Sequence, residues 1–323
     1  RQIRQAIESA ADVESLQRSA ADVRQLSFNM LAQGIGAEQL TQFISALNDA
    51  LTRRVLELNL HNHPFDGVDW AWLAFGSEGR DEQTFSTDQD NGIVFTCPDA
   101  AEVKQLRKRF LAFALDVNKD LDRCGFPLCK GNIMASNPQW CLTLQEWKNQ
   151  FSKWVRSPEP DALLNASIFF DFRALFGNAE LAEQMRHFLL TATGGNSLFL
   201  QSMARNALSV APPLGTIRDF ITDLEPGNPG KIDLKKYGSR IFVDVARIYA
   251  LATGVHNTNS VQRLRIASKR LAIRDEEVNA VLEGLDFIQL LRLRHQYLED
   301  KPGVQGDNLI DPNDLNELDR RVL

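Results

Sequence analysis

The sequence of 323 residues lacks several features that define common protein classes. No apolar run reaches the roughly 20 residues that span a bilayer, and no signal peptide is visible, so we expect no membrane partner. Basic residues are not in excess, since the net charge is −6 and the pI is about 5.5. Because proteins that bind nucleic acid usually carry a basic balance or a basic stripe, we expect no nucleic-acid partner either.

Cysteines are few, and the spacings that mark common catalytic motifs are missing. The four cysteines, at positions 97, 124, 129 and 141, include no Cys-x-x-Cys pair. We interpret them as reduced thiols of a cytoplasmic protein, with a zinc site as the alternative. A Walker A motif, an HExxH motif and a G-x-S-x-G motif are also absent, so the chemistry has to be sought in other residues.

The remaining composition is that of an ordinary globular protein. Apolar residues make up 44% and charged residues 24% of the chain, and the length allows two or three domains with a substantial core. Because the chain begins with Arg1 rather than Met, and because the last expected helix stops at Leu323, we expect a piece of a longer protein.

One stretch combines a strand pattern, a glycine turn and a pair of aspartates. Trp70–Phe75 is an apolar run of strand length, and Gly76–Arg80 reads Gly-Ser-x-Gly-Arg. Asp88 and Asp90 stand just ahead of the apolar residues 93–95. Because residues i and i+2 of a strand point to the same face, we expect both carboxylates to project together. Mg²⁺ is commonly held by one or two carboxylates, with substrate phosphates completing its coordination.

The glycine turn offers groups that bind phosphate. Gly76 and Gly79 have no Cβ atom, so their backbone N–H groups can approach a phosphate oxygen closely. Ser77 adds a hydroxyl donor, and Arg80 adds a fixed positive fork. The alternative for the whole stretch is a β-hairpin whose polar loop is merely solvated.

The string GSEGRDEQ…STDQDNGIVF resembles the nucleotidyltransferases that are found fused behind cyclic-nucleotide-binding and CBS domains. These are relatives of the PII uridylyltransferase, whose corresponding stretch also has glycines, a Gly-Arg pair, an acidic residue and paired aspartates. The wider fold is that of DNA polymerase beta and kanamycin nucleotidyltransferase. The resemblance implies an α+β protein with a small mixed sheet, flanking helices and a C-terminal helical bundle.

The resemblance also implies an activity, namely transfer of a nucleoside monophosphate from an NTP with Mg²⁺ or Mn²⁺ as cofactor. The acceptor would be a PII-like protein or another hydroxyl compound, and the role would be signal transduction. Upstream CBS or cyclic-nucleotide-binding domains would belong to the same full-length chain. Two alternatives stay open: a nucleotide-binding regulatory module without catalysis, and a nucleotidyltransferase that modifies small molecules.

A third acidic residue stands in the stretch SIFFDFRALFGN. Ile168–Phe172 is apolar and rich in β-formers, with Asp171 as its single charge, and a lone carboxylate there needs a cation partner. The similar relatives carry an acidic residue followed closely by Arg in a matching segment. We therefore expect Asp171 to join Asp88 and Asp90 at the metal, and an ion pair with Arg173 is the alternative.

The chain divides into three expected parts. They are a helical region over 1–60, a nucleotidyltransferase domain over 61–178 and a helical, substrate-binding-like domain over 179–323, with the active site between sheet and bundle. The resemblance implies that Lys235, Lys236 and Arg240 contact a triphosphate or the acceptor, although a charged helix start is the alternative. Expected helices cover about 1–27, 37–60, 100–123, 179–190, 197–209, 241–252, 259–271 and 275–298, and a short strand is expected over 132–135.

Overall fold

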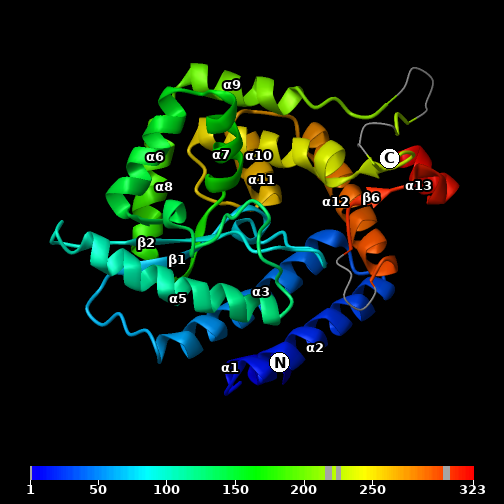
Figure 1. Cartoon of the computed structure of the whole chain (residues 1–323). Helices are drawn as coiled ribbons and strands as arrows, with labels where there is room; N and C mark the ends of the chain where they lie inside the picture. The colour runs from blue at the N-terminus through cyan, green and yellow to red at the C-terminus, as the bar shows by residue number, and fades with distance from the viewer. Residues whose placement is uncertain (1, 215–219, 223–226, 301–305) are drawn as a thin grey trace.

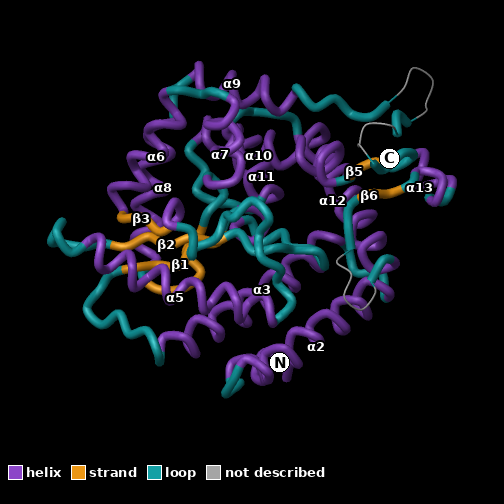
Figure 2. Tube along the Cα trace, in the orientation of Figure 1, coloured by secondary structure: helices purple, strands orange, loops and turns teal. Residues whose placement is uncertain are grey.

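The computed structural model describes residues 2–214, 220–222, 227–300 and 306–323. Helices surround one small sheet, as Figure 1 and Figure 2 show, which confirms the expected α+β class. None of the described helices is long and apolar enough to cross a membrane. Within these ranges the α-helices are α1 (Gln2–Glu8), α2 (Val13–Ala32), α3 (Ala37–Leu60), α4 (Gly76–Gly79), α5 (Val103–Arg123), α6 (Leu144–Arg156), α7 (Pro160–Phe169), α8 (Ala179–Thr193), α9 (Ser197–Leu208), α10 (Arg240–Thr253), α11 (Ser260–Arg270), α12 (Asp275–Leu298) and α13 (Glu317–Val322).

The central sheet is mixed. Its strands are β1 (Trp70–Ala74), β2 (Asn91–Phe95), β3 (Cys141–Thr143) and β4 (Arg173–Gly177), in the order β3-β2-β1-β4. β1 runs antiparallel to β2 and β4, whereas β2 and β3 are parallel. Ala74 pairs with Asn91 on one side and with Arg173 on the other. The segments just before β2 and β4, which carry Asp90 and Asp171, therefore enter the sheet at the same edge, where β1 ends.

Alternate residues of β1 enter two different cores. Trp72 belongs to a cluster with Val55 of α3 and Phe113 of α5. Leu73 belongs to a second cluster with Trp147 of α6 and Met185 of α8. In Figure 1, α3 and α5 accordingly lie on one side of β1 and β2, and α6 and α8 lie on the other. Because both faces are covered, the strand reads as a continuous apolar run instead of an alternating one.

The N-terminal region contains more helices than the sequence pattern predicts. The single helix expected over 1–27 is wrong, since α1 ends at Glu8 and α2 begins at Val13. Asp12 separates them, because its side chain accepts a hydrogen bond of 2.8 Å from the Ser15 N–H and so caps α2. The helix expected over 37–60 is confirmed as α3.

The strand expected over Ile168–Phe172 is wrong. α7 begins with Pro160, whose fixed φ suits a first helical turn, and continues to Phe169. The strand β4 begins only at Arg173. Packing overrides β-propensity here, because the phenylalanines of this segment fill the core against α6. Asp171 therefore lies in the turn between α7 and β4.

The short strand expected over 132–135 is also wrong. Asn132 has a φ of +54°, a left-handed turn conformation that does not continue a strand. The strand of this region is β3, which follows a 3-10 turn at Pro138–Trp140. Thr143 and Glu146 form a capping box that opens α6, as their spacing of three residues predicts.

The second half of the chain is mainly helical, as expected. α8 to α12 begin and end within three residues of the expected helices. A two-stranded ribbon of β5 (Ile232–Asp233) and β6 (Leu309–Ile310) was not expected, nor was the π-helical turn η2 (Lys235–Ser239) that precedes α10. Because α8 contributes to the core of the sheet, the structure draws no sharp line at residue 178, and the three-domain division stays a prediction.

Candidate functional site

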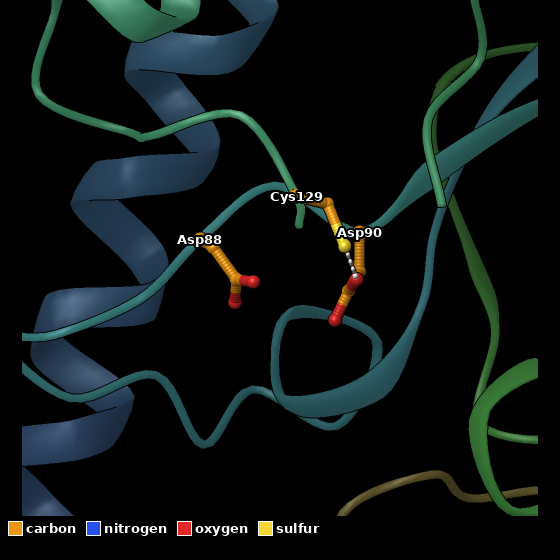
Figure 3. A group of neighbouring side chains, drawn as sticks. All are labelled: Asp88, Asp90 and Cys129. Atoms are coloured by element: carbon orange, nitrogen blue, oxygen red, sulfur yellow. Dashed lines mark hydrogen bonds between the residues drawn. The ribbon is translucent and has the colours of Figure 1, made fainter. Parts of the chain in front are cut away.

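Two aspartates and a cysteine meet near the start of β2. Asp88 and Asp90 lie in the segment that leads into this strand, and Cys129 lies in the loop after α5. One ligand atom from each side chain lies within 4.8 Å of the others, and Figure 3 shows the three side chains side by side. The structure thus brings the two carboxylates together, as their i, i+2 spacing predicts. That they bind a metal stays a prediction.

The electrostatic setting of Asp90 is unusual for a carboxylate. Burial, followed by the negative charge of Asp88, raises the pKa of Asp90 to about 7. The Cys129 thiol donates to Oδ1 of Asp90 at 3.4 Å and, with the charges of Lys235 and Arg80, opposes that rise. Burial also raises the pKa of Cys129 to about 11, which keeps it a thiol at neutral pH. A bound cation would relieve the repulsion within this pair.

Three buried amide side chains fix the segment that carries the two aspartates. In the string DQDN the aspartates alternate with Gln89 and Asn91, which point to α5 instead. Asn118 of α5 donates from Nδ2 to Gln89 Oε1 at 2.8 Å and to Asn91 Oδ1 at 3.0 Å. The Ala135 N–H donates to Asn91 Oδ1 at 2.8 Å, and the Ser136 N–H donates to Asn118 Oδ1 at 3.3 Å. This network joins the aspartate segment, α5 and the loop after Cys129 into one unit.

The glycine turn forms the short helix α4 and lies against the aspartate pair. The Phe75 N–H donates to the backbone oxygen of Asp90 at 2.9 Å. Gly76 has a φ of +56°, and a Cβ atom at this position would lie 3.0 Å from Asp90 Oδ2. A Cβ at Gly79 would lie 2.0 Å from the backbone oxygen of Asp171, so any side chain there is excluded. Gly79 is therefore required for packing, and its phosphate role stays a prediction, as does that of Ser77.

Arg80 and Asp171 belong to a buried ion cluster. Arg80 donates from Nε to Glu82 and from Nη1 to Asp171 Oδ2, both at 2.8 Å. Arg247 and Arg263 also donate to the Asp171 carboxylate. Burial alone would raise the pKa of Asp171, but the charges of these three arginines hold it well below its usual range. Arg173, which the sequence offered as the alternative partner of Asp171, instead pairs with carboxylates at positions 49 and 81.

The structure does not place Asp171 in the group of Asp88, Asp90 and Cys129, as far as the described residues show. Its part as a third metal ligand stays a prediction, and no contact in this geometry supports it.

Two models from one family match this chain. The first, described as "Putative nucleotidyltransferase DUF294", matches residues 21–161. The second, "Putative nucleotidyltransferase substrate binding domain", matches residues 197–323. The two matches support an enzyme of the nucleotidyltransferase type. No curated protein matches the chain.

The two matched regions divide the candidate site between them. The nucleotidyltransferase region holds the aspartate pair, the glycine turn and Arg80. The substrate-binding region holds Lys235, Lys236 and Arg240. Asp171 lies in the segment between the two matches.

The lysines of the substrate-binding region begin the π-helical turn η2. The N–H groups of Lys235 and Lys236 donate to Asp233 Oδ1 at 2.8 and 3.0 Å, and both side chains are exposed. The charge of Lys235 opposes the rise in the pKa of Asp90 that burial causes, so this lysine lies within electrostatic reach of the aspartate pair. Arg240 pairs at 3.4 Å with a carboxylate of its own helix. The contact of all three with a triphosphate stays a prediction.

Two large cavities among the described residues do not contain the aspartate pair. One of about 620 Å³ is lined by α2, α3 and the segments just upstream of Asp88 and Cys129. The other, of about 540 Å³, is lined by residues of α3, α8 and the loop before α11. Neither has Asp88 or Asp90 in its lining, so the candidate site depends on the side-chain group and not on a cavity.

Sequence reasoning missed several residues of this site. The alternation in DQDN could have indicated the amide side chains, because period two sends neighbours to opposite faces. Asn118 could have been found as a polar residue on the apolar stripe of α5. Cys129, Arg247 and Arg263 carry no such signal, since their places depend on how distant segments meet.

Proposed function

We propose that this chain is a nucleotidyltransferase that uses Mg²⁺ or Mn²⁺ to transfer a nucleoside monophosphate from an NTP to a hydroxyl acceptor. The observation that carries the proposal is the aspartate pair beside the glycine turn. No lysine or arginine forms an ion pair with either carboxylate in the part of the chain that the structure describes. Burial and the charge of Asp88 raise the pKa of Asp90 to about 7, and a bound metal ion would relieve that repulsion.

The residues of the site fit this metal. Carboxylate oxygens are the hard ligands that Mg²⁺ and Mn²⁺ prefer, and Asp88 and Asp90 supply them together. Cys129, which stays a thiol at neutral pH, would hold Asp90 through its hydrogen bond and would not itself be a ligand. When bound, such an ion neutralises phosphate charge and orients the reacting oxygens.

The other named residues would then handle the nucleotide. Arg80 and Lys235 both act electrostatically on Asp90, so they are near enough to offset the negative charge of a triphosphate and of the departing pyrophosphate. The positive φ of Gly76 keeps the turn free of a side chain where it meets the aspartate pair. Ser77, Gly79, Lys236 and Arg240 complete the proposed phosphate-binding set.

The finer assignment rests on the resemblance seen in the sequence. We propose a PII-like protein or another hydroxyl compound as acceptor, a role in signal transduction, and CBS or cyclic-nucleotide-binding domains upstream on the same full-length chain. Uridylyl and adenylyl transfer are both compatible with the site.

Labelled nucleotides test the proposed activity. The protein is incubated with each α-³²P-labelled NTP, Mg²⁺ and a lysate or metabolite panel, and pyrophosphate and labelled products are measured. We expect pyrophosphate release with at least one NTP and acceptor, and none with the Asp88→Asn/Asp90→Asn double variant. Tight NTP binding without release across the panel would instead indicate a regulatory nucleotide-binding module.

A further inference from the structure

We propose that Asp171 is a positioning residue, which ties Arg80 to Arg247 of α10 and Arg263 of α11. The packing of these two helices would then set the affinity for the triphosphate. The inference deepens the proposed function and rests on it for the identity of the ligand. The observation behind it is the arginine cluster around one carboxylate, which joins residues from both matched regions.

The hydrogen bonds of Asp171 leave no place for a metal ion. Oδ1 accepts from Arg247 Nε at 3.0 Å and from Arg263 Nη1 at 2.5 Å. Oδ2 accepts from Arg247 Nη2 at 2.6 Å and from Arg80 Nη1 at 2.8 Å. An ionised carboxylate offers about four lone-pair positions, and these contacts use all of them. A metal ion would have to displace an arginine from a buried site.

The cluster is closed to water and balanced in charge. The Asp171 side chain is 0% exposed, and those of Arg247 and Arg263 are 2% and 1% exposed. Asp244 pairs with Arg247 at 2.6 Å, and Arg80 pairs with Glu82, so three carboxylates face three guanidinium groups. Removing one partner from such a buried set leaves another charge uncompensated, which makes the arrangement rigid.

A second set of contacts joins the segment of Arg80 and Glu82 to the start of α11. Asn259 donates from Nδ2 to the backbone oxygen of Arg80 at 3.0 Å. The Ser260 N–H donates to Glu82 Oε1 at 2.5 Å. The substrate-binding region therefore holds the backbone of Arg80 directly, and it holds the side chain through Asp171 and Glu82. A shift of α11 relative to the sheet has to move Arg80 or break these bonds.

The fixed position of Arg80 leaves part of its guanidinium group free to bind a ligand. Its Nε and Nη1 donate to Glu82 and Asp171, and no hydrogen bond occupies Nη2 within the described ranges. Its side chain is 12% exposed, and its charge acts on Asp90 of the metal group. One donor edge of a fixed guanidinium is therefore left for a phosphate oxygen beside the aspartates.

The test measures NTP binding without divalent ions. In EDTA, Asp171→Asn should bind NTP about tenfold more weakly than wild type, because its phosphate-binding arginine is no longer held. Loss of a metal ligand would leave metal-free binding unchanged or improved.

Arg263→Lys, which keeps the charge but loses the forked contact, should show a smaller loss of NTP affinity than Asp171→Asn does. Asp120→Asn is the control, since it removes a carboxylate from Arg123 at the end of α5 without touching Arg80 or the glycine turn. Metal-free NTP affinity at the wild-type value in both test variants would overturn the proposal.

Hydrogen exchange provides a reading that does not depend on the ligand. The amides of Arg80 and Glu82 donate to the backbone oxygens of Gly76 and Ser77, so they report on this turn. We expect them to exchange faster in Arg263→Lys than in wild type, and to be unchanged in Asp120→Asn. If wild type binds no NTP, the proposed function fails, but hydrogen exchange still tests whether Asp171 positions Arg80. Unchanged exchange in Arg263→Lys would then overturn this positioning role.

Discussion

Two carboxylate sites at the same edge of the sheet have opposite electrostatic settings. Asp90 lies beside another aspartate and a thiol, and burial raises its pKa to about 7. Asp171 is surrounded by three arginines, whose charges outweigh burial and hold its pKa well below the usual range. No arginine or lysine forms an ion pair with the aspartates of the first site in the part of the chain that the structure describes. The carboxylate of the second site already has three arginine partners. The comparison shows that partners, and not residue type, decide which carboxylate is available to a ligand.

The comparison predicts that removing the aspartate pair has the largest effect on function. Asp88→Asn/Asp90→Asn should reduce metal-dependent nucleotidyl transfer by more than about 100-fold, because even outer partners of metal ligands cost about 10–100-fold when lost. Pyrophosphate release at saturating NTP measures this, with circular dichroism as a control for folding. Residual transfer within a few-fold of wild type would remove the aspartate pair from the mechanism.

The second site should matter more than the first to the stability of the protein. Asp171→Asn should lower the free energy of unfolding by about 3–5 kcal/mol, because it leaves buried arginines without their shared carboxylate. Asp90→Asn should leave the metal-free protein as stable or more stable, because it removes repulsion with Asp88. Urea denaturation at pH 8 without divalent ions measures both. A stable Asp171→Asn variant would favour the metal-ligand hypothesis drawn from the sequence.

The amide network should matter to the first site alone. Asn118→Leu breaks the hydrogen bonds to Gln89 and Asn91 and lets the aspartate segment reorient. We expect Mn²⁺ affinity to fall by about 10–100-fold, as is usual for residues that orient metal ligands. Thr143→Ala is a control that removes a helix cap at the end of β2 opposite the aspartates, and it should cost about 1 kcal/mol of stability without changing Mn²⁺ affinity. Equal Mn²⁺ affinity in both variants would exclude an orienting role.

The pH dependence sharpens the contrast further. The proton of Asp90 competes with the metal, so Mn²⁺ affinity should fall about tenfold for each pH unit below 7 and level off above it. The folded-state pKa lies above the unfolded value of about 3.9, so the fold holds more protons and the metal-free protein should lose stability as pH rises from about 4 to 7. Asp90→Asn should abolish this contribution. A flat Mn²⁺ affinity between pH 5 and 8 would contradict the raised pKa.

The sequence predicted well what depends on short spacing. The i, i+2 aspartates come together, and α3, α12 and the capping box at Thr143 follow local patterns of apolar and capping residues. These features need only neighbours a few residues apart.

The sequence could not show what depends on distant segments. Ile168–Phe172 looks like a strand because its residues favour one, but packing of its aromatic rings against α6 keeps Ile168 and Phe169 helical. The partner of Asp171 was sought two residues away, whereas Arg247 and Arg263 come from helices more than 70 residues later. No local pattern marks either arginine, so the nature of this carboxylate site became visible only in the fold.

An Mn²⁺ titration of the metal-free protein tests the central claim most directly. Free Mn²⁺ is measured by its electron paramagnetic resonance signal for wild type, Asp90→Asn and Asp171→Asn, at a temperature and pH where all three are folded. We predict that Asp90→Asn loses most of the Mn²⁺ affinity, while Asp171→Asn keeps it within about twofold, since its carboxylate binds arginines and not metal. An equal loss of Mn²⁺ affinity in both variants would contradict the account.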